Sequence, residues 1–496
     1  MKVSLNWIKE FVNLDGIDEN ELIKRFNLTT AEIEGVEHKG ENISGVVFAR
    51  IEKVESIPES TKLHKLQVFN GTETVQIMCG APNVREGMIV CLAQIGARVC
   101  GQKISKAKLA GYESFGMCCG ADELGIGSDT SGLIDVDFPV ILGQDIKEVL
   151  PVCDTIFEID NKSLTNRPDL WGHYGLAREF AVMFNRELMP LDQCDLAKYD
   201  NLKEIRINVN TDKCLRYSAI SLDNITKKES SWKMKTRLCY CGMRDINLLA
   251  DITNYIMLEL GQPLHAFDGG KVSAINVNMA KDGDKLLTLE GEEHQIPENA
   301  IVICDQNNLP CAIAGIKGGK VASISDETSS VLFEAAVFDS ATIRKASTKI
   351  GLKTDSSIRY EKSLDPENTK TALQRTIYLL KKLDNGIVVT SKFSDCYNHK
   401  YVVEPIEISE DFISNRIGMP VKQEKIVDIL TKLGFSVSVD GKKIIAKVPS
   451  YRATKDISMK EDLVEEVARV IGYDNIIPQP ILVDVCPVEQ KRDHLA

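Results

Sequence analysis

The chain has 496 residues, 43% of them hydrophobic and 27% charged, with a formal net charge of −12 at pH 7. This composition is ordinary for a soluble globular protein, and the length allows three or four domains that each bury a core. The acidic balance argues against a surface that coats nucleic acid generally, and no apolar run approaches the roughly 18 residues of a membrane span, so we expect a cytoplasmic protein without a membrane segment.

Fourteen cysteines are spread along the chain. The closest groups, Cys118-Cys119 and Cys239-x-Cys241, lack the paired CxxC spacing of a zinc site. We therefore expect buried free thiols.

The first 150 residues contain two kinds of pattern. Residues 1–40 carry two apolar stripes at helical spacing and predict two short helices. Residues 42–150 contain short apolar runs separated by Gly, Asn and Pro, which is typical of a small β-barrel. Lysines in such a barrel can bind nucleic acid, and a solvated barrel surface explains them nearly as well. The candidates are Lys62, Lys65, Lys103, Lys106 and Lys108.

The remaining chain divides into four parts. Residues 151–203 predict a connecting helical segment, and residues 204–395 mix expected strands and helices in one large layered domain. Residues 405–480 predict a helix, a hairpin turned at Asp440-Gly441 and a second helix. Residues 481–496 form a polar tail. The sequence thus predicts a multidomain α+β protein.

The stretch from Asp251 to Asp268 carries the clearest local pattern. Ile252, Ile256 and Leu260 repeat at helical spacing, and Gly261 followed by Pro263 ends the helix. His265 is therefore expected on an irregular segment just beyond a buried helix, although a lone histidine in a loop is more often structural.

Glu334 is the most informative candidate in the large domain. It lies within the apolar segment 331–338, and burial of a carboxylate is costly unless it is paired or hydrogen-bonded. One interpretation is a structural ion pair, for instance with Arg244 or Arg359. The other is that Glu334 accepts a hydrogen bond from a ligand hydroxyl.

Four acidic residues near the end of the chain form a second candidate site. Asp462, Glu465 and Glu466 share one helical face, and Asp456 precedes them. Oxygen ligands of this kind suit Mg²⁺, and a solvated acidic face is the alternative.

Several of these segments, in the same order, resemble the bacterial phenylalanyl-tRNA synthetase β subunit family. The strongest is Thr253-Asn-Tyr-Ile-Met-Leu-Glu-Leu-Gly-Gln-Pro-Leu-His-Ala-Phe-Asp268, supported by Cys79-Gly-Ala-Pro-Asn-Val84 and by the stretch 456–469. The resemblance implies an OB-type tRNA-binding barrel, a large mixed α/β editing domain and a small winged-helix-like module with a Mg²⁺ site. Family members continue into a catalytic-core-like domain and an anticodon-binding domain, which are not recognisable here.

The resemblance also implies a pocket that hydrolyses mischarged Tyr-tRNA(Phe). A synthetic site shaped for phenylalanine rejects an added hydroxyl only about a hundredfold, so a second pocket that requires the hydroxyl improves fidelity. Glu334 would read that hydroxyl, and Thr354 with the backbone of 314–319 would stabilise the oxyanion. His265 would act either as general base for the attacking water or as a donor that positions the water and the terminal adenosine, and we favour positioning. The other implied pocket residues are Arg244, Thr253, Asn254, Pro263, Gly315, Gly318 and Ser356. Asp245, Lys317 and Ser356 depart from the usual family residues.

The family assignment carries expectations about partners. It implies a separate α subunit in an α2β2 assembly that charges tRNA(Phe), with Mg²⁺ as cofactor and with ATP used by the assembly and not bound by this chain. Two alternatives stay open: a non-catalytic tRNA-binding and assembly scaffold with an idle pocket, and an RNA-binding protein whose main activity lies in residues 42–150.

Overall fold

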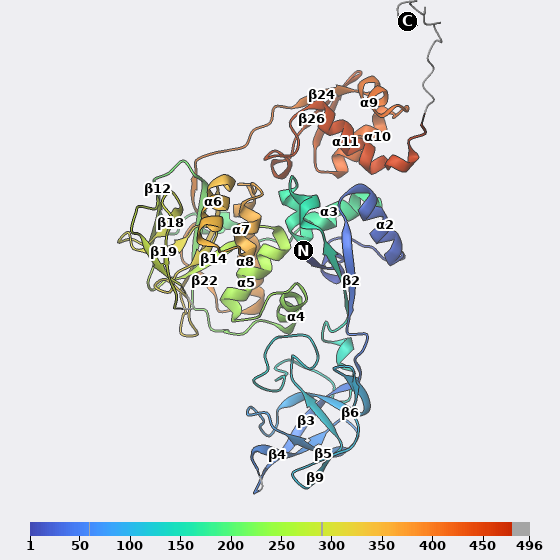
Figure 1. Cartoon of the computed structure of the whole chain (residues 1–496), viewed down its shortest axis with the longest axis vertical. Helices are drawn as coiled ribbons and strands as arrows, with labels where there is room; N and C mark the ends of the chain where they lie inside the picture. The colour runs from blue at the N-terminus through green and yellow to red at the C-terminus, as the bar shows by residue number, and fades with distance from the viewer. Residues whose placement is uncertain (59, 289–290, 479–496) are drawn as a thin grey trace, which may run out of the picture.

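The computed structural model describes residues 1–58, 60–288 and 291–478, so the predicted tail at 481–496 lies outside the described residues. Figure 1 shows an elongated molecule with a barrel-like sheet at one end, a small helical module at the other and a large mixed region between them. The cysteines within the described ranges are free thiols; seven of them are buried, as predicted, whereas Cys100 and Cys153 are exposed. None of the helices in these ranges combines the length and apolar character that a membrane crossing needs.

The N-terminal segment is a small sheet with two helices packed beside it. The helices α1 (Leu5–Ile8) and α2 (Glu19–Thr29) agree with the two apolar stripes. The sequence pattern missed the antiparallel sheet β1-β11-β2, because β11 arrives from 115 residues beyond β2. Its strands are β1 (Lys2–Ser4), β2 (Ile33–Lys39) and β11 (Asp154–Ile159).

Residues 44–119 form the barrel-like end of the molecule. The main sheet runs in the order β10-β6-β3-β4-β5, and β10 also lies beside β5, so the sheet curves round on itself. Its strands are β3 (Ser44–Ile57), β4 (Ser60–Phe69), β5 (Thr74–Cys79), β6 (Ile89–Val99), β7 (Gln102–Lys103) and β10 (Gly116–Cys119). A separate hairpin joins β8 (Ala107–Leu109) to β9 (Tyr112–Ser114), and the short helix η1 (Ile146–Glu148) follows.

A connecting region links this end to the large domain. It contains η2 (Asn161–Leu164), η3 (Pro168–Trp171), α3 (His173–Met183) and η4 (Leu196–Tyr199). Leu176 and Phe180 of α3 are buried in the same core as the N-terminal helices and α5, so the predicted connecting helix is present and packs centrally.

The large mixed region is built on two sheets. The first has the order β14-β21-β13-β22, with β23 also paired to β13, and its centre is the fully buried strand β21. Its strands are β13 (Cys214–Asp223), β14 (Leu264–Asp268), β21 (Val331–Phe338), β22 (Val388–Val389) and β23 (Ser394–Tyr397). The second sheet contains β12 (Arg206–Val209), β15 (Ala274–Met279), β18 (Ile301–Cys304), β19 (Pro310–Ile313) and β20 (Lys317–Gly318).

Five helices pack around these sheets, and a small hairpin lies at the edge (Figure 1). Apolar residues of α5 and α8 share one core with β21, while α6 and α7 pack against the second core. The helices are α4 (Trp232–Tyr240), α5 (Leu248–Leu260), α6 (Ser340–Ile350), α7 (Asp355–Tyr360) and α8 (Asn368–Leu383). The hairpin joins β16 (Lys285–Leu287) to β17 (Glu293–Gln295).

The helix α5 ends where its sequence predicts, but the segment after it has a different structure from the one predicted. Gly261 takes the left-handed conformation at φ 73° that stops the helix. His265, however, lies on the regular strand β14 rather than on an irregular segment. The reason is that the chain after Pro263 pairs antiparallel with β21, which places His265 directly opposite Glu334.

The last module has its own core and a three-stranded sheet in the order β24-β26-β25. The predicted helix, hairpin and helix are present, while β24 and α9 were not predicted. Asp440 pairs with Lys443, so the hairpin turns at Gly441-Lys442, one residue later than expected. The elements are β24 (Ile406–Ser409), α9 (Glu410–Ile417), α10 (Gln423–Lys432), β25 (Ser436–Asp440), β26 (Lys443–Lys447), η5 (Ser450–Arg452), α11 (Lys460–Ile471) and η6 (Tyr473–Asn475).

Candidate functional site

A small pocket lies where β14, β21, the β19–β20 turn and the start of α7 meet. It encloses about 70 Å³ and has apolar walls from Ile303, Ile313 and Ile316. Six of the predicted site residues line it: Pro263, His265, Gly315, Gly318, Glu334 and Ser356. Segments that are up to 93 residues apart in sequence therefore contribute to one wall, as the predicted convergence requires.

Glu334 is held by a tyrosine and not by an arginine. Its side chain is 4% exposed, and the Tyr217 hydroxyl donates to its Oε2 at 2.7 Å. Burial raises the pKa of Glu334 to about 7, with the hydrogen bond from Tyr217 opposing the rise. The alternative interpretation, an ion pair with Arg244 or Arg359, does not hold within the described residues, because Arg359 binds Asp355 at 3.0 Å and Arg244 is exposed.

His265 is a neutral imidazole facing the same pocket. Burial lowers its pKa to about 4, and its ring lies edge-on to Phe267 with the centroids 4.5 Å apart. Within the described residues no carboxylate binds the ring. Glu259, on the preceding helix, is instead buried in an ion pair with Arg375 at 2.7 Å.

Neighbouring side chains leave no room for a Cβ atom at the two pocket glycines. A Cβ on Gly318 would lie 2.7 Å from Cε1 of His265, and one on Gly315 would lie 2.6 Å from Cδ2 of Tyr360. Gly315 also has φ +66°, a conformation that favours glycine. The turn is thus open because the imidazole and the phenol occupy the space that side chains would fill.

Thr354 and Ser356 connect α7 to the pocket in different ways. Thr354 caps the helix and donates its hydroxyl to the Ile316 carbonyl at 3.1 Å, so it fixes the pocket turn without lining the cavity. Ser356 lines the cavity, and its hydroxyl lies 3.7 Å from Sδ of Met257.

Three predicted pocket residues lie elsewhere. Arg244 is on the exposed segment after α4. Thr253 and Asn254 are on α5, where the Thr253 hydroxyl donates back to the Ala250 carbonyl at 2.7 Å. The structure does not bring these three side chains to the cavity wall.

The predicted lysines all lie in the barrel-like end, and two of them are paired with glutamates. Lys65 pairs with Glu55 at 2.6 Å and Lys106 with Glu113 at 2.7 Å. The other three, Lys62, Lys103 and Lys108, are exposed.

The four predicted Mg²⁺ ligands have different partners. Asp456 pairs with Arg452, and Glu466 pairs with Arg452 and Arg469 at 2.8 and 2.5 Å. Asp462 accepts two backbone N–H bonds at the start of α11, and Glu465 is exposed. Within the described residues no group of three or more His, Cys, Asp or Glu side chains is placed to hold a metal ion. This donor set does not fit a Mg²⁺ site, because arginines already neutralise its two buried carboxylates.

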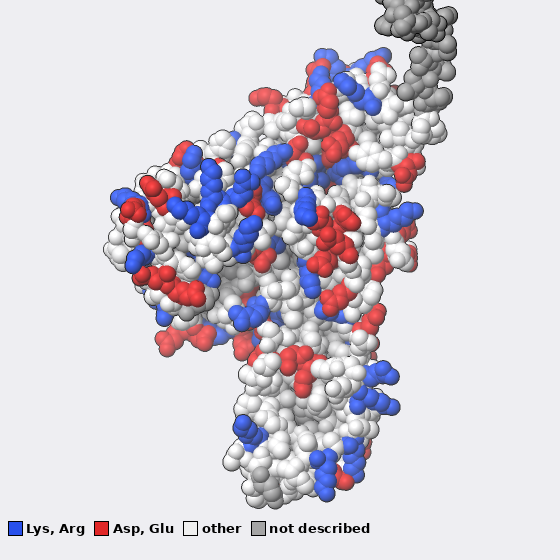
Figure 2. All heavy atoms as spheres, in the orientation of Figure 1, with Lys and Arg blue, Asp and Glu red and all other residues white. Residues whose placement is uncertain are grey.

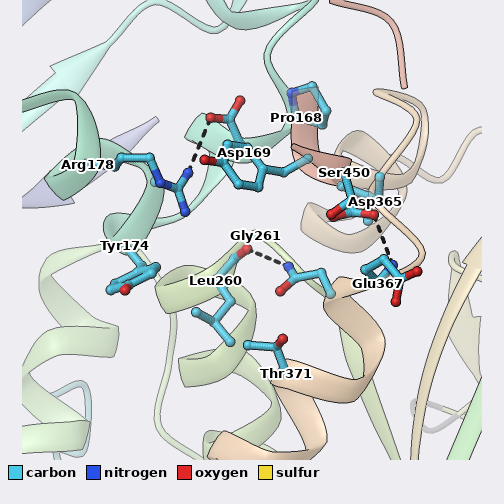
Figure 3. A pocket seen from close by; sticks show the side chains of 14 residues that line it. Pro168, Asp169, Tyr174, Arg178, Leu260, Gly261, Asp365, Glu367, Thr371 and Ser450 are labelled. Atoms are coloured by element: carbon cyan, nitrogen blue, oxygen red, sulfur yellow. Dashed lines mark hydrogen bonds and ion pairs between the residues drawn. The ribbon is translucent and has the colours of Figure 1, made fainter. Parts of the chain in front are cut away.

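A larger cavity of about 230 Å³ was not predicted (Figure 3). It lies between α3, the end of α5, the start of α8 and residues 450–451. Its charged groups are satisfied by the protein: Arg178 lies 3.6 Å from Asp169, and Ser450 donates to Asp365 at 2.7 Å. The cavity is therefore a crevice at the joint between the last module and the large region.

Comparisons with known proteins match three stretches of the chain to family models. These are the putative tRNA binding domain over residues 46–145, the B3/4 domain over 213–385 and the tRNA synthetase B5 domain over 406–473. The candidate pocket falls within the B3/4 match, and the arginine-paired carboxylates fall within the B5 match.

Full-length relatives match almost the whole chain. The phenylalanine–tRNA ligase beta subunit of Solibacter usitatus is 39% identical over 97% of this chain and 61% of that protein. That of Clostridium acetobutylicum is 36% identical over 96% and 60%. The chain thus spans about three fifths of the length of these relatives.

A solved structure with partial likeness is an N-terminal fragment of the phenylalanyl-tRNA synthetase β subunit from Pyrococcus horikoshii. It is 16% identical, covers 64% of this chain and 88% of that chain, and has a TM-score of 0.38. Over almost its whole length the chain is similar to phenylalanine–tRNA ligase beta subunits, and it contains a putative tRNA binding domain, a B3/4 domain and a tRNA synthetase B5 domain in that order.

Proposed function

We propose that this chain works with a separate α subunit to charge tRNA(Phe), and that it hydrolyses mischarged Tyr-tRNA(Phe) in the pocket between β14, β21 and α7. In this proposal the enzyme is cytoplasmic, the assembly is α2β2, and the α subunit binds ATP. No step is assigned to Mg²⁺ on this chain, because Asp456 and Glu466, two of the four predicted ligands, are paired with Arg452.

The observation that carries the proposal is the state of Glu334 in the pocket wall. Tyr217 occupies Oε2, and within the described residues Oε1 has no hydrogen-bond partner. A ligand that fills the cavity removes this oxygen from water, which is costly unless a hydroxyl of the ligand donates a hydrogen bond to it. A phenylalanyl side chain cannot do so. The pocket therefore favours tyrosine by leaving Glu334 unsatisfied when phenylalanine binds.

The hydrolytic step needs a water at the ester carbonyl. Water forms the new C–O bond, the bond to the ribose oxygen of the terminal adenosine breaks, and the proton of the water passes to that oxygen. A base with a pKa of about 4 is a poor match to neutral pH, so His265 positions the water by hydrogen bonding rather than removing its proton.

Stabilisation of the oxyanion falls to the backbone of the turn. The Thr354 hydroxyl is already used by the Ile316 carbonyl. The N–H of Gly315 makes no hydrogen bond within the described residues and lies in the pocket turn. Backbone N–H groups of this kind are effective donors to a developing oxyanion.

The test is deacylation of Tyr-tRNA(Phe) and Phe-tRNA(Phe) by the wild-type chain, Glu334→Ala and His265→Ala. We expect selective hydrolysis of the tyrosyl ester, loss of the preference in Glu334→Ala, and a slow but still selective reaction in His265→Ala. A folded chain that binds tRNA but hydrolyses neither ester would support the scaffold alternative.

A further inference from the structure

Basic side chains gather on the outer side of α6 and continue to the start of α7. We call this set the α6 basic face: Arg344, Lys345, Lys349, Lys353 and Lys455. The first three are on α6, Lys353 precedes α7, and Lys455 comes from the last module. All five are exposed. Figure 2 shows Lys and Arg side chains crowded over the place where Figure 1 puts α6 and α7.

The acidic residues nearby do not neutralise this face. Asp339 caps α6 by accepting the N–H and hydroxyl of Thr342, and Asp355 pairs with Arg359 at 3.0 Å. Glu361 lies 3.8 Å from Lys362. Among the described residues, none of the five members of the α6 basic face has an ion pair within 4.0 Å.

The fold holds these positive charges close together although they repel one another. Lys345 and Lys349 are four residues apart on one helix, where like charges repel each other and destabilise the helix. Burial lowers the pKa of Lys455, repulsion from Lys362 and Arg344 lowers it further, and the attraction of Asp339 opposes the shift without reversing it. A chain with net charge −12 thus maintains a local concentration of positive charge. Such a patch attracts a polyanion.

The α6 basic face is continuous with the wall of the candidate pocket. Lys353 is followed by Thr354, whose hydroxyl binds the Ile316 carbonyl at 3.1 Å, and Ile316 lines the cavity. Ser356, three residues after Lys353, lines it too. The helix α6 packs directly on α7. A polyanion lying on α6 would therefore have one end at the pocket.

We infer that the α6 basic face docks the phosphates of the RNA acceptor end while the terminal aminoacyl ester enters the pocket. The inference rests on the proposed function for the identity of that ester. Lysines and arginines bind phosphates by releasing condensed counterions, so the interaction weakens with salt. This surface is separate from the lysines of the barrel-like end, which lies at the far end of the long axis (Figure 1).

The direct test measures how tightly the chain binds an acceptor-stem minihelix RNA with a single-stranded 3′ end. Fluorescence anisotropy gives the Kd at a series of KCl concentrations. We expect the triple variant Lys345→Glu, Lys349→Glu, Lys353→Glu to bind at least about tenfold more weakly. The slope of log Kd against log salt should fall by about 2, because each phosphate that a lysine neutralises adds about 0.7 to that slope.

A matched control carries the same charge change on another surface. Lys422, Lys425 and Lys442 of the last module are exposed and have no ion pair within the described residues. Their triple change to Glu should leave the Kd within about twofold. Equal losses in both triple variants, or wild-type affinity in the α6 variant, would overturn the inference.

Hydrolysis of 3′-O-tyrosyl adenosine, which has no phosphates, distinguishes this inference from the proposed function. The α6 variant should hydrolyse it at the wild-type rate while kcat/KM for Tyr-tRNA(Phe) falls. If the wild-type chain hydrolyses neither substrate, the proposed function fails, and minihelix binding still decides the docking surface. If the α6 variant also fails to hydrolyse 3′-O-tyrosyl adenosine, the variant with Lys345, Lys349 and Lys353 changed to Arg decides. Binding of the minihelix with wild-type affinity by that variant supports the inference, and weak binding overturns it.

Discussion

Tyr217 controls how the acidic side chain in the pocket can act. It is buried on β13, the strand next to β21, and does not line the cavity, yet its hydroxyl fixes one of the two oxygens of Glu334. The bond favours the ionised carboxylate and directs the second oxygen to a ligand. Tyr217 is therefore a positioning residue, and its effect should appear as a change in pH dependence.

We predict that Tyr217→Phe raises the pH midpoint for hydrolysis of the tyrosyl ester. The pKa of Glu334 is raised from 4.5 to about 7, so the ionised fraction of this carboxyl grows between pH 6 and pH 8. The value of kcat/KM for Tyr-tRNA(Phe), measured after subtraction of the uncatalysed rate, should rise over the same range. Without the Tyr217 hydroxyl the ionised form loses a hydrogen bond, and the midpoint moves to higher pH. An unchanged midpoint with a uniformly lower rate would indicate only a structural role.

We predict that Gly318→Ala slows hydrolysis by about 10- to 100-fold while tyrosine recognition persists. The new methyl group would lie 2.7 Å from the His265 ring, so the imidazole must move. A displacement of about 1 Å at a positioning group can cost about a hundredfold in rate. Single-turnover deacylation measures the effect. Gly80→Ala, whose Cβ would have no neighbour closer than 3.6 Å, is the matched control and should react like wild type.

At the scale of elements, α11 is attached to α3 by a buried charge network. Arg469 pairs with Glu466 on its own helix and with Glu179 on α3 at 2.7 Å, and Arg167 joins Glu179 at 2.6 Å. Burial raises the pKa of Glu179, but the two arginines outweigh it and leave that pKa well below the ordinary range. The arginines supply the positive charge that a bound Mg²⁺ would otherwise supply to these carboxylates. The pair between Arg469 and Glu179 links the last module to the central core.

We predict that Arg469→Met destabilises this attachment by about 3–5 kcal/mol, because Glu179 and Glu466 would stay buried while each loses one of its two arginine partners. The first urea-unfolding transition should move to lower urea concentration. Arg416→Met, which removes an exposed pair with Glu461, should cost no more than about 1 kcal/mol. Addition of Mg²⁺ or a chelator should leave the wild-type transition unchanged, and a clear stabilisation by Mg²⁺ would contradict the account of this network.

Much of this arrangement follows from local sequence, and the rest depends on long-range pairing. The end of α5 at Gly261 and the buried strand around Glu334 were predicted, since glycine conformation and apolar runs act locally. The strand at His265 was not, because its partner lies 69 residues away. The bond from Tyr217, 117 residues from Glu334, has no local signal at all.

At the scale of the whole molecule, the modules are arranged along one axis with the candidate pocket in the central region (Figure 1). The net charge of −12 confines any RNA contact to local basic surfaces. The barrel-like end and the α6 basic face offer two such surfaces, one far from the pocket and one beside it. The same surfaces would allow one tRNA to be held at two points while only its terminal ester is examined.

The central claim is that the pocket requires a tyrosine hydroxyl. The most direct measurement is the affinity of the chain for amide-linked 3′-tyrosyl and 3′-phenylalanyl adenosine analogues, which cannot be hydrolysed, by calorimetry at pH 8. We expect the tyrosyl analogue to bind at least about a hundredfold more tightly, and we expect Glu334→Gln to remove most of the difference. Equal affinities in the wild-type chain would show that the pocket does not recognise the hydroxyl.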